Sequence, residues 1–119
     1  MVTIALVDDE NSIRTSVSLA LESEGFKVDV FQNGLEALEA LESKNYDLGL
    51  FDIKMPKMDG NELLSKVRSS KNNALKEMPI IFLTSKDQEQ DEIIGLRMGA
   101  ADYITKPFSQ KLLNERIRT

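Results

Sequence analysis

The sequence predicts an α/β fold in which helices cover both faces of a five-stranded parallel sheet. Two observations carry this prediction. Five short apolar runs of strand length occur along the chain, and segments with apolar residues at helical spacing separate them. Strands and helices that alternate in this way form a parallel sheet buried between helical layers. Because crossovers between parallel strands are right-handed, few topologies remain, chiefly the doubly wound three-layer sandwich.

The predicted strands have the length and the β-rich content that are typical of buried strands. They are TIALV (3–7), KVDVF (27–31), DLGLF (47–51), PIIFL (79–83) and DYIT (102–105). Between the third and fourth strands, the polar run SSKNNALKE (69–77) is interpreted as a solvated loop that follows a helix.

Stripes of apolar residues with helical spacing fill the intervals between the strands. In the first interval, Ile13, Val17 and Leu21 recur every fourth residue and would form one face of a helix. The later stripes are Leu35, Leu38 and Leu41; Leu63, Leu64 and Val67; Ile93, Ile94 and Leu96; and Leu112, Leu113 and Ile117. Gly25 and Gly99 stand where the first and fourth helices should end, as glycines commonly do.

The composition excludes several kinds of chemistry and of partner. The chain has 119 residues, which suits one domain (1–119), and it contains no Cys and no His. Disulfides, thiolate metal sites and histidine acid–base chemistry are therefore excluded. The net charge of −5 argues against a face that grips nucleic acid. No signal peptide and no apolar stretch of about 20 residues is seen, so we expect a cytoplasmic protein with no membrane contact.

Polar residues follow four of the predicted strands, at the point where each strand ends. Asp8 and Asp9 follow the first strand, Asp52 the third, Thr84 the fourth and Lys106 the fifth. Taken singly, each has a structural explanation, such as a helix start, a turn cap, a strand end or a solvated charge. Because the carboxyl ends of parallel strands meet at one edge of the sheet, their coincidence there predicts a ligand site.

The residue types at this edge indicate phosphoryl chemistry with a hard cation. Carboxylates brought within a few Å of one another repel unless a cation lies among them. Oxygen donors without His or Cys favour Mg²⁺, with Mn²⁺ and Ca²⁺ as alternatives. Such an ion holds a phosphoryl oxygen, while Lys106 and the Thr84 hydroxyl can contact two others. Asp52 is then the candidate nucleophile that forms an aspartyl-phosphate, and Asp8 and Asp9 are candidates to hold the metal.

Four motifs, in this order, resemble the receiver domain of two-component response regulators. They are VDDE (7–10), FDIKMPKMDG (51–60), LTS (83–85) and DYITKPF (102–108), and together they extend over nearly the whole chain. The resemblance implies the flavodoxin-like (βα)5 sandwich with strand order 2-1-3-4-5. It also implies a signalling switch that catalyses only its own phosphorylation and dephosphorylation and is not a conventional turnover enzyme.

The resemblance assigns roles around the metal. It implies that Asp52 accepts a phosphoryl group from a phosphohistidine of a sensor histidine kinase. It further implies that Asp9 and Asp52 ligate Mg²⁺ directly, together with the backbone carbonyl of Lys54, whereas Asp8 acts largely through water.

The resemblance assigns further roles at the fourth and fifth strands. Thr84 and Lys106 would contact the phosphoryl group, Tyr103 would be the switch aromatic that turns inward, and the Lys106–Pro107 peptide would be cis. Lys86, like Lys54, occupies a position that tunes the lifetime of the phosphoryl group in this family.

The sequence departs from the family pattern at one position of the phosphoryl pocket, described here, and at one position of the dimer face, described below. Ser85 stands where the family commonly has Ala, and its added hydroxyl would narrow access to the phosphoryl group slightly or have no effect. Lys54 and Lys86 either alter how water attacks the acyl phosphate or are simply solvated.

The segment 98–117 resembles winged-helix (OmpR/PhoB-type) transcriptional regulators, which form homodimers when phosphorylated. The dimer face would carry Arg97, Asp102 and Arg116, with Asp102 of one subunit paired to Arg116 of the other. Ala101 stands where those proteins usually have another acid, so one family ion pair lacks its carboxylate. We expect a C-terminal DNA-binding effector domain in the full-length protein, and DNA contact only through that domain.

Other functions remain as alternatives. A free-standing receiver is the main one. A Mg²⁺-dependent phosphatase with an aspartate nucleophile uses similar chemistry, but it usually carries its nucleophile after the first strand and adds a cap. A flavin-binding module would need a less acidic loop than DDENS, and a degenerate receiver would lack site residues that are present here.

Overall fold

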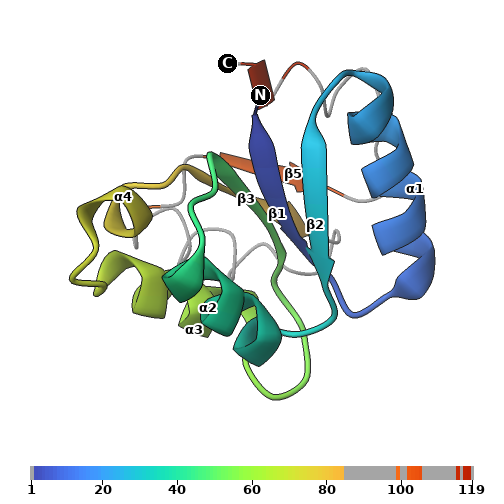
Figure 1. The fold of residues 1–119 in the computed structure, drawn as a ribbon. Helices are drawn as coiled ribbons and strands as arrows, with labels where there is room; N and C mark the ends of the chain where they lie inside the picture. The colour runs from blue at the N-terminus through green and yellow to red at the C-terminus, as the bar shows by residue number, and fades with distance from the viewer. Residues whose placement is uncertain (1, 85–98, 100–101, 106–114, 116, 119) are drawn as a thin grey trace.

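Five parallel strands form a single sheet in the order β2-β1-β3-β4-β5. This computed structural model describes residues 2–84, 99, 102–105, 115, 117 and 118 (Figure 1). The strands are β1 (Thr3–Val7), β2 (Lys27–Phe31), β3 (Leu48–Asp52), β4 (Ile80–Thr84) and β5 (Asp102–Thr105). The predicted fold class and strand order are confirmed. Each predicted strand lies within one residue of the observed one, because short β-rich runs bounded by polar residues mark strands strongly.

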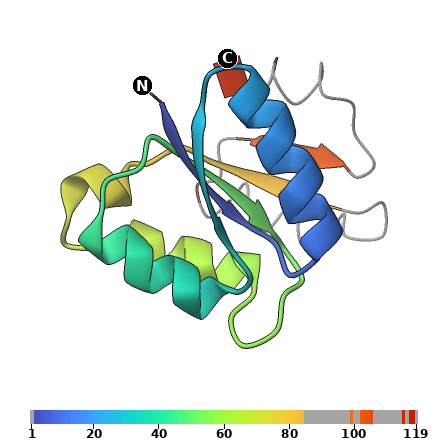
Figure 2. The same ribbon diagram turned by 45° about the vertical axis from the view of Figure 1, so that its right-hand side comes forward.

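Helices cover both faces of the sheet, as Figures 1 and 2 show from two directions. α1 (Asn11–Ser23) lies on one face, whereas α2 (Gly34–Ser43), α3 (Gly60–Arg68) and α4 (Asn73–Lys76) lie on the other. Successive strand residues point to opposite faces, so β1 contributes to two separate cores. Ile4 and Leu6 pack with Val17 and Leu21 of α1, whereas Ala5 belongs to the core under α2 and α3.

The segment 69–77 is not the solvated loop that the sequence suggested. It contains the short helix α4, which is capped by Asn72: the Asn72 side chain accepts hydrogen bonds from Ala74 N at 3.0 Å and Leu75 N at 3.4 Å. Leu75 is only 5% exposed and packs into the core under α2 and α3. Two adjacent apolar residues, Ala74 and Leu75, in a polar run show no helical periodicity, so this burial could not be predicted.

The prediction that a helix ends at Gly25 is confirmed, because α1 ends at Ser23, whereas the helix predicted before Gly99 lies outside the described residues. Gly25 and Gly99 have φ of 92° and 106°, in the left-handed region that glycine adopts at least cost. Most residues of the two helices predicted around 93–96 and 112–117 lie outside the described residues. Within the part of the chain that is described, no helix has both the length and the apolar character needed to cross a membrane.

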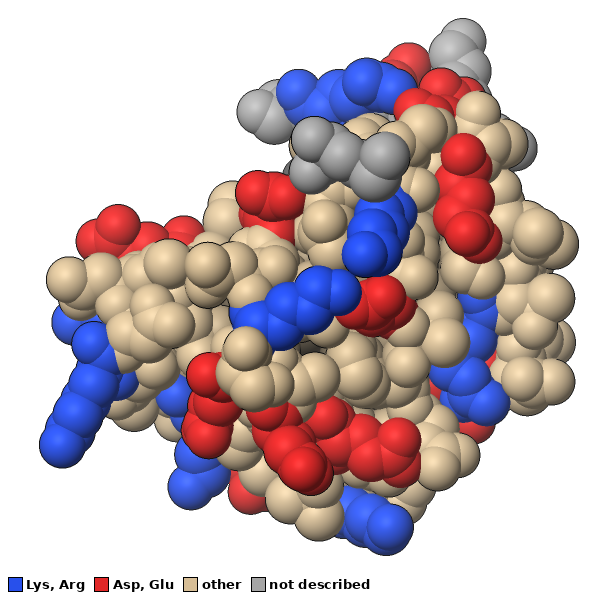
Figure 3. Space-filling model, in the orientation of Figure 1, with Lys and Arg blue, Asp and Glu red and all other residues tan. Residues whose placement is uncertain are grey.

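The surface of the domain carries a concentration of acidic side chains. Figure 3 shows acidic groups gathered over α2, and this helix contributes the exposed residues Glu36, Glu39 and Glu42. Such a surface repels the phosphates of nucleic acid, as the net charge of −5 also implies.

Candidate metal and phosphoryl site

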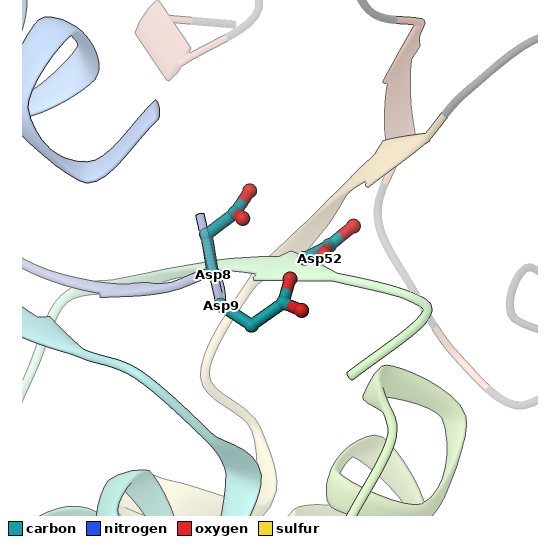
Figure 4. Close-up of side chains that lie close together, drawn as sticks. All are labelled: Asp8, Asp9 and Asp52. Carbon is teal, nitrogen blue, oxygen red and sulfur yellow. The ribbon is translucent and has the colours of Figure 1, made fainter. Parts of the chain in front are cut away.

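Three carboxylates converge where β1 and β3 end. One oxygen from each of Asp8, Asp9 and Asp52 can be chosen so that all lie within 4.8 Å of one another (Figure 4). Asp52 is the last residue of β3, and Asp8 directly follows β1. Asp8 is fully buried and Asp52 is 5% exposed, whereas Asp9 is exposed. The predicted convergence of these residues is confirmed, and the cluster opens to solvent on the side of Asp9.

Backbone and side-chain hydrogen bonds hold Asp8 in place. Its N–H donates to the carbonyl of Phe31 at 3.1 Å, which extends the pairing of β1 with β2 by one residue. Its Oδ1 accepts from Glu10 N at 2.9 Å. Its carbonyl accepts from Nη1 of Arg14 at 2.7 Å, so that α1 fixes the turn that leads out of β1. The first carboxylate of the cluster is therefore rigidly placed before any cation binds.

Asp59 and Gly60 have structural roles at the start of α3, whereas Asp52 belongs to the carboxylate cluster. The Asp59 side chain caps α3 by accepting from Glu62 N at 2.8 Å. Gly60 N donates to the carbonyl of Ile53 at 2.7 Å. A Cβ on Gly60 would lie 2.9 Å from Ile53 Cα and would overlap the carbonyl oxygen of Asp52. Gly60 is therefore required because the start of α3 lies against the end of β3.

The same loop contains a strained residue. Lys57 has φ of 69°, a left-handed conformation that costs a non-glycine residue about 1 kcal/mol. The loop thus turns sharply between Asp52 and Asp59, and that turn brings α3 back against the strand end. Lys54 lies at the beginning of this loop with an exposed side chain.

The donor set of the cluster fits a small hard cation. Three carboxylates within 4.8 Å of one another repel strongly without a positive charge among them. Within the described residues this set offers oxygen ligands only, which suits Mg²⁺ and, with a larger shell, Mn²⁺ or Ca²⁺. An exposed third carboxylate leaves coordination positions for water and for a phosphoryl oxygen.

The strand register brings the remaining site positions to the same edge. Asp52 is paired with Leu83, and Thr84 is paired with Thr105. Thr84 and Thr105 are the last residues of β4 and β5, so these two strands end at the same edge of the sheet as β3. The side chains of Thr84, Asp102 and Tyr103 are not among the described ones.

Several predicted site residues lie outside the described residues. They are Ser85, Lys86, Arg97, Ala101, Lys106, Pro107 and Arg116. Their predicted roles, and the predicted cis peptide at 106–107, therefore stay predictions. The same holds for metal ligation by the backbone carbonyl of Lys54.

Sequence reasoning missed two features near the site. Arg14 contacts the carbonyl of Asp8, and an arginine in the first turn of the helix after the acidic run was a usable sign of it. Gly34, the first residue of α2, packs so tightly on Met58 that a Cβ would lie 2.9 Å from Met58 Cβ. That contact has no sequence signature, because it joins the start of α2 to the loop before α3, and only the fold brings these segments together.

The comparison with protein families gives one match over nearly the whole chain. The family model of the response regulator receiver domain matches residues 4–118. Among curated proteins, the transcriptional regulatory protein PhoP for alkaline phosphatase synthesis in Bacillus subtilis is 42% identical over 115 residues, covering 97% of this chain and 46% of PhoP. The transcriptional regulatory protein PcoR of Escherichia coli is 38% identical over 119 residues, covering 100% of this chain and 51% of PcoR. The chain thus spans about half the length of these relatives.

Solved structures give the same result for the fold. The chemotaxis protein CheY4 of Vibrio cholerae superimposes with a TM-score of 0.91 at 31% identity, covering 99% of this chain and 97% of that one. The receiver domain of a sensor histidine kinase from Pseudomonas aeruginosa gives a TM-score of 0.89 at 29% identity, covering 98% and 93%. That structure has a magnesium ion coordinated in its active-site cleft.

Proposed function

This chain belongs to the response regulator receiver domain family, and on that premise we propose that it is a phosphorylation-activated switch of a two-component system. It accepts a phosphoryl group on Asp52 from a phosphohistidine of a sensor histidine kinase. The observation that carries the proposal is the cluster of Asp8, Asp9 and Asp52, whose oxygens lie within 4.8 Å of one another at the end of the sheet.

The chemistry follows from the position of Asp52. A carboxylate oxygen of Asp52 attacks phosphorus in line, the new P–O bond forms, and the N–P bond of the phosphohistidine breaks. The imidazole of the donor leaves with the electron pair. The chain needs no histidine of its own for this step, which agrees with its composition.

Asp9, Asp52 and the carbonyl of Lys54 would hold Mg²⁺, and Asp8 would contact it through water. Bound there, the ion neutralises charge on the carboxylates and on the phosphoryl oxygens. Asp8 is held by Glu10 N, so its carboxylate is oriented in advance. Because Asp8 is held in place before binding, it needs little reorganisation during phosphoryl transfer.

The switch itself is assigned to the residues that follow β4 and β5. Thr84 and Lys106 contact phosphoryl oxygens, and Tyr103 turns inward as Thr84 moves. One hydrogen bond to a charged oxygen contributes about 1.5–3 kcal/mol. A shift from 1:99 to 99:1 requires about 5.5 kcal/mol. Full activation therefore needs the Thr84 and Lys106 contacts together with a partner that prefers the active form.

The receiver would act within a longer regulatory protein. The curated relatives are about twice as long as this chain and are transcriptional regulators. We therefore assign residues 1–119 to the receiver of a cytoplasmic regulator whose DNA-binding effector domain lies elsewhere in the full-length protein. Phosphorylation promotes a homodimer through the face that carries Arg97, Asp102 and Arg116, and Lys54 and Lys86 tune how long the phosphoryl group persists.

Intact-mass measurement tests the phosphoryl acceptor. The purified domain is incubated with acetyl phosphate and Mg²⁺, and one added phosphoryl group is expected. Asp52→Ala should show no gain, whereas the matched variant Asp59→Ala should retain it, because Asp59 caps α3 and lies outside the cluster. A gain of mass in Asp52→Ala equal to that of the wild type would contradict the assignment. Sustained release of phosphate without a stable adduct would favour a phosphatase.

A further inference from the structure

Arg68, the last residue of α3, binds three backbone carbonyls with one guanidinium group. Nη1 donates to the carbonyl of Lys76 at 2.9 Å and to that of Met78 at 2.8 Å. Nη2 donates to the carbonyl of Gly99 at 2.7 Å. Because the acceptors lie 8, 10 and 31 residues away in sequence, Arg68 joins three separate parts of the chain.

Gly99 is adapted to this contact. Its φ of 106° turns the backbone through the left-handed region. A Cβ at this position would lie 3.1 Å from Nε of Arg68, closer than nearly all real contacts of that kind. The glycine therefore permits both the turn and the close approach of the guanidinium, which marks the contact as a built feature of the fold.

The carbonyls that Arg68 binds stand just before two strands. Met78 lies two residues before β4, and Gly99 lies three residues before β5. β5 is an edge strand of four residues that pairs only with β4 within the described sheet, from Ile81 opposite Asp102 to Thr84 opposite Thr105. A short strand with one hydrogen-bonded neighbour is weakly held, so an additional anchor at its amino-terminal end affects its placement.

Arg68 is partly buried, and this strengthens the anchor. Loss of solvent around the guanidinium lowers the pKa of Arg68, but an arginine stays charged at neutral pH. Charged donors to carbonyls form stronger hydrogen bonds than neutral ones. A lysine has a single ammonium on a flexible stem and cannot reproduce the planar fork that spans three acceptors.

We propose that Arg68 is a positioning residue for phosphoryl transfer, which it serves by fixing the amino-terminal ends of β4 and β5. The carboxyl-terminal ends of these strands lead to Thr84 and Lys106, about 13 Å away along the strands. A displaced β5 would deliver the Lys106 ammonium away from the phosphoryl group. Asp52 is the last residue of β3, and Asp8 and Asp9 lie in the turn after β1, so none of the three carboxylates is on β4 or β5. This inference rests on the proposed function.

The test separates metal binding from phosphoryl transfer in Arg68→Lys. Mg²⁺ affinity is measured by calorimetry, and the rate of phosphorylation by acetyl phosphate is measured by intact mass, both well below the unfolding temperature. We expect an unchanged dissociation constant for Mg²⁺ and a rate that is about tenfold lower, since sub-ångström misplacement of a reacting group has effects of that order. A general loss of folded protein would lower the heat of Mg²⁺ binding and the phosphorylation rate by the same fraction. That outcome would overturn the proposal.

A double-mutant cycle identifies the route of the effect. Lys106→Met removes the ammonium that follows β5, so in that background Arg68→Lys should lower the rate by clearly less than tenfold, through β4 and Thr84 alone. A further tenfold loss in that background would overturn the proposed route. Gly99→Ala disturbs the same contact, because its added Cβ would lie 3.1 Å from Nε of Arg68. It should therefore give the same loss of rate with unchanged Mg²⁺ affinity.

Arg118→Lys is the matched control for Arg68→Lys. Arg118→Lys removes an exposed guanidinium whose contact to Glu24 is 3.5 Å long, and it should change neither quantity. If Arg68→Lys is phosphorylated on Asp52 at the wild-type rate, this inference is wrong and the proposed function stands. If Asp52→Ala still gains a phosphoryl group, the proposed function itself is wrong.

Discussion

At the scale of single residues, Asp29 on β2 is a source of pH-dependent stability. Its Oδ2 accepts from Lys44 Nζ at 2.8 Å and from Tyr46 Oη at 2.7 Å. The bond from Lys44, followed by that from Tyr46, lowers the pKa of Asp29. A lowered folded-state pKa stabilises the protein above the unfolded pKa, and this contribution disappears as pH falls through the folded pKa. Burial and Asp29 raise the pKa of Tyr46, so its hydroxyl stays a donor.

We expect Asp29→Asn to lower the free energy of unfolding by about 1 kcal/mol at neutral pH, because its carboxylate and the Lys44 ammonium are partly screened by solvent. The difference from wild type should shrink toward zero in strongly acidic solution, as the pH falls through the lowered folded-state pKa of Asp29 and the wild-type carboxyl is neutralised. Urea unfolding at both pH values measures it. Tyr46→Phe, which keeps the Lys44 contact, should retain part of the pH dependence. An Asp29→Asn deficit that is equal at both pH values would contradict the assignment.

At the scale of elements, the strands and the carboxylate cluster could be predicted, because each depends on the strand patterns of the sequence. Asp8, Asp9 and Asp52 follow β-rich runs directly, and parallel strands bring their ends together by geometry alone. The contacts of Arg68 could not be predicted, because its partners are backbone carbonyls and any residue type supplies those. The helix α4 was missed because four residues carry no periodic signal.

Gly60 and Gly25 test what the junction between β3 and α3 contributes. Gly60→Ala places a methyl group against Ile53 Cα and the Asp52 carbonyl, so the end of β3 must shift. We expect Mg²⁺ affinity to fall by about tenfold or more in calorimetry, since Asp52 moves with the strand. Gly25→Ala meets no atom within 4 Å and is strained only by its φ of 92°. It should therefore lower stability by about 1 kcal/mol and leave Mg²⁺ affinity unchanged. Equal affinities in the two variants would show that the junction does not position Asp52.

At the scale of the whole molecule, the proposed cation binding should be linked to folding, because the carboxylate cluster forms only when the chain folds. Asp52 lies 43 positions after Asp9 in the sequence, yet one carboxylate oxygen from each of Asp8, Asp9 and Asp52 lies within 4.8 Å of the others after folding. Mg²⁺ at about 100 times its dissociation constant should add about 2.7 kcal/mol to the free energy of unfolding. For a domain of this size the unfolding temperature should rise by about 10 °C.

Asp9→Asn should be more stable than wild type without Mg²⁺ and less stable than wild type with saturating Mg²⁺. Without Mg²⁺, the substitution removes the repulsion between Asp9 and the other two carboxylates. The free energy of unfolding of the variant should therefore be about 1 kcal/mol higher than that of wild type. With saturating Mg²⁺, it lacks one ligand and should be the less stable of the two. Calorimetric unfolding in chelator and in excess Mg²⁺ measures both differences, and Asp59→Asn serves as the control outside the cluster. A variant that stayed more stable than wild type in excess Mg²⁺ would mean that Asp9 is not a ligand, because only the loss of metal binding can outweigh the relief of repulsion.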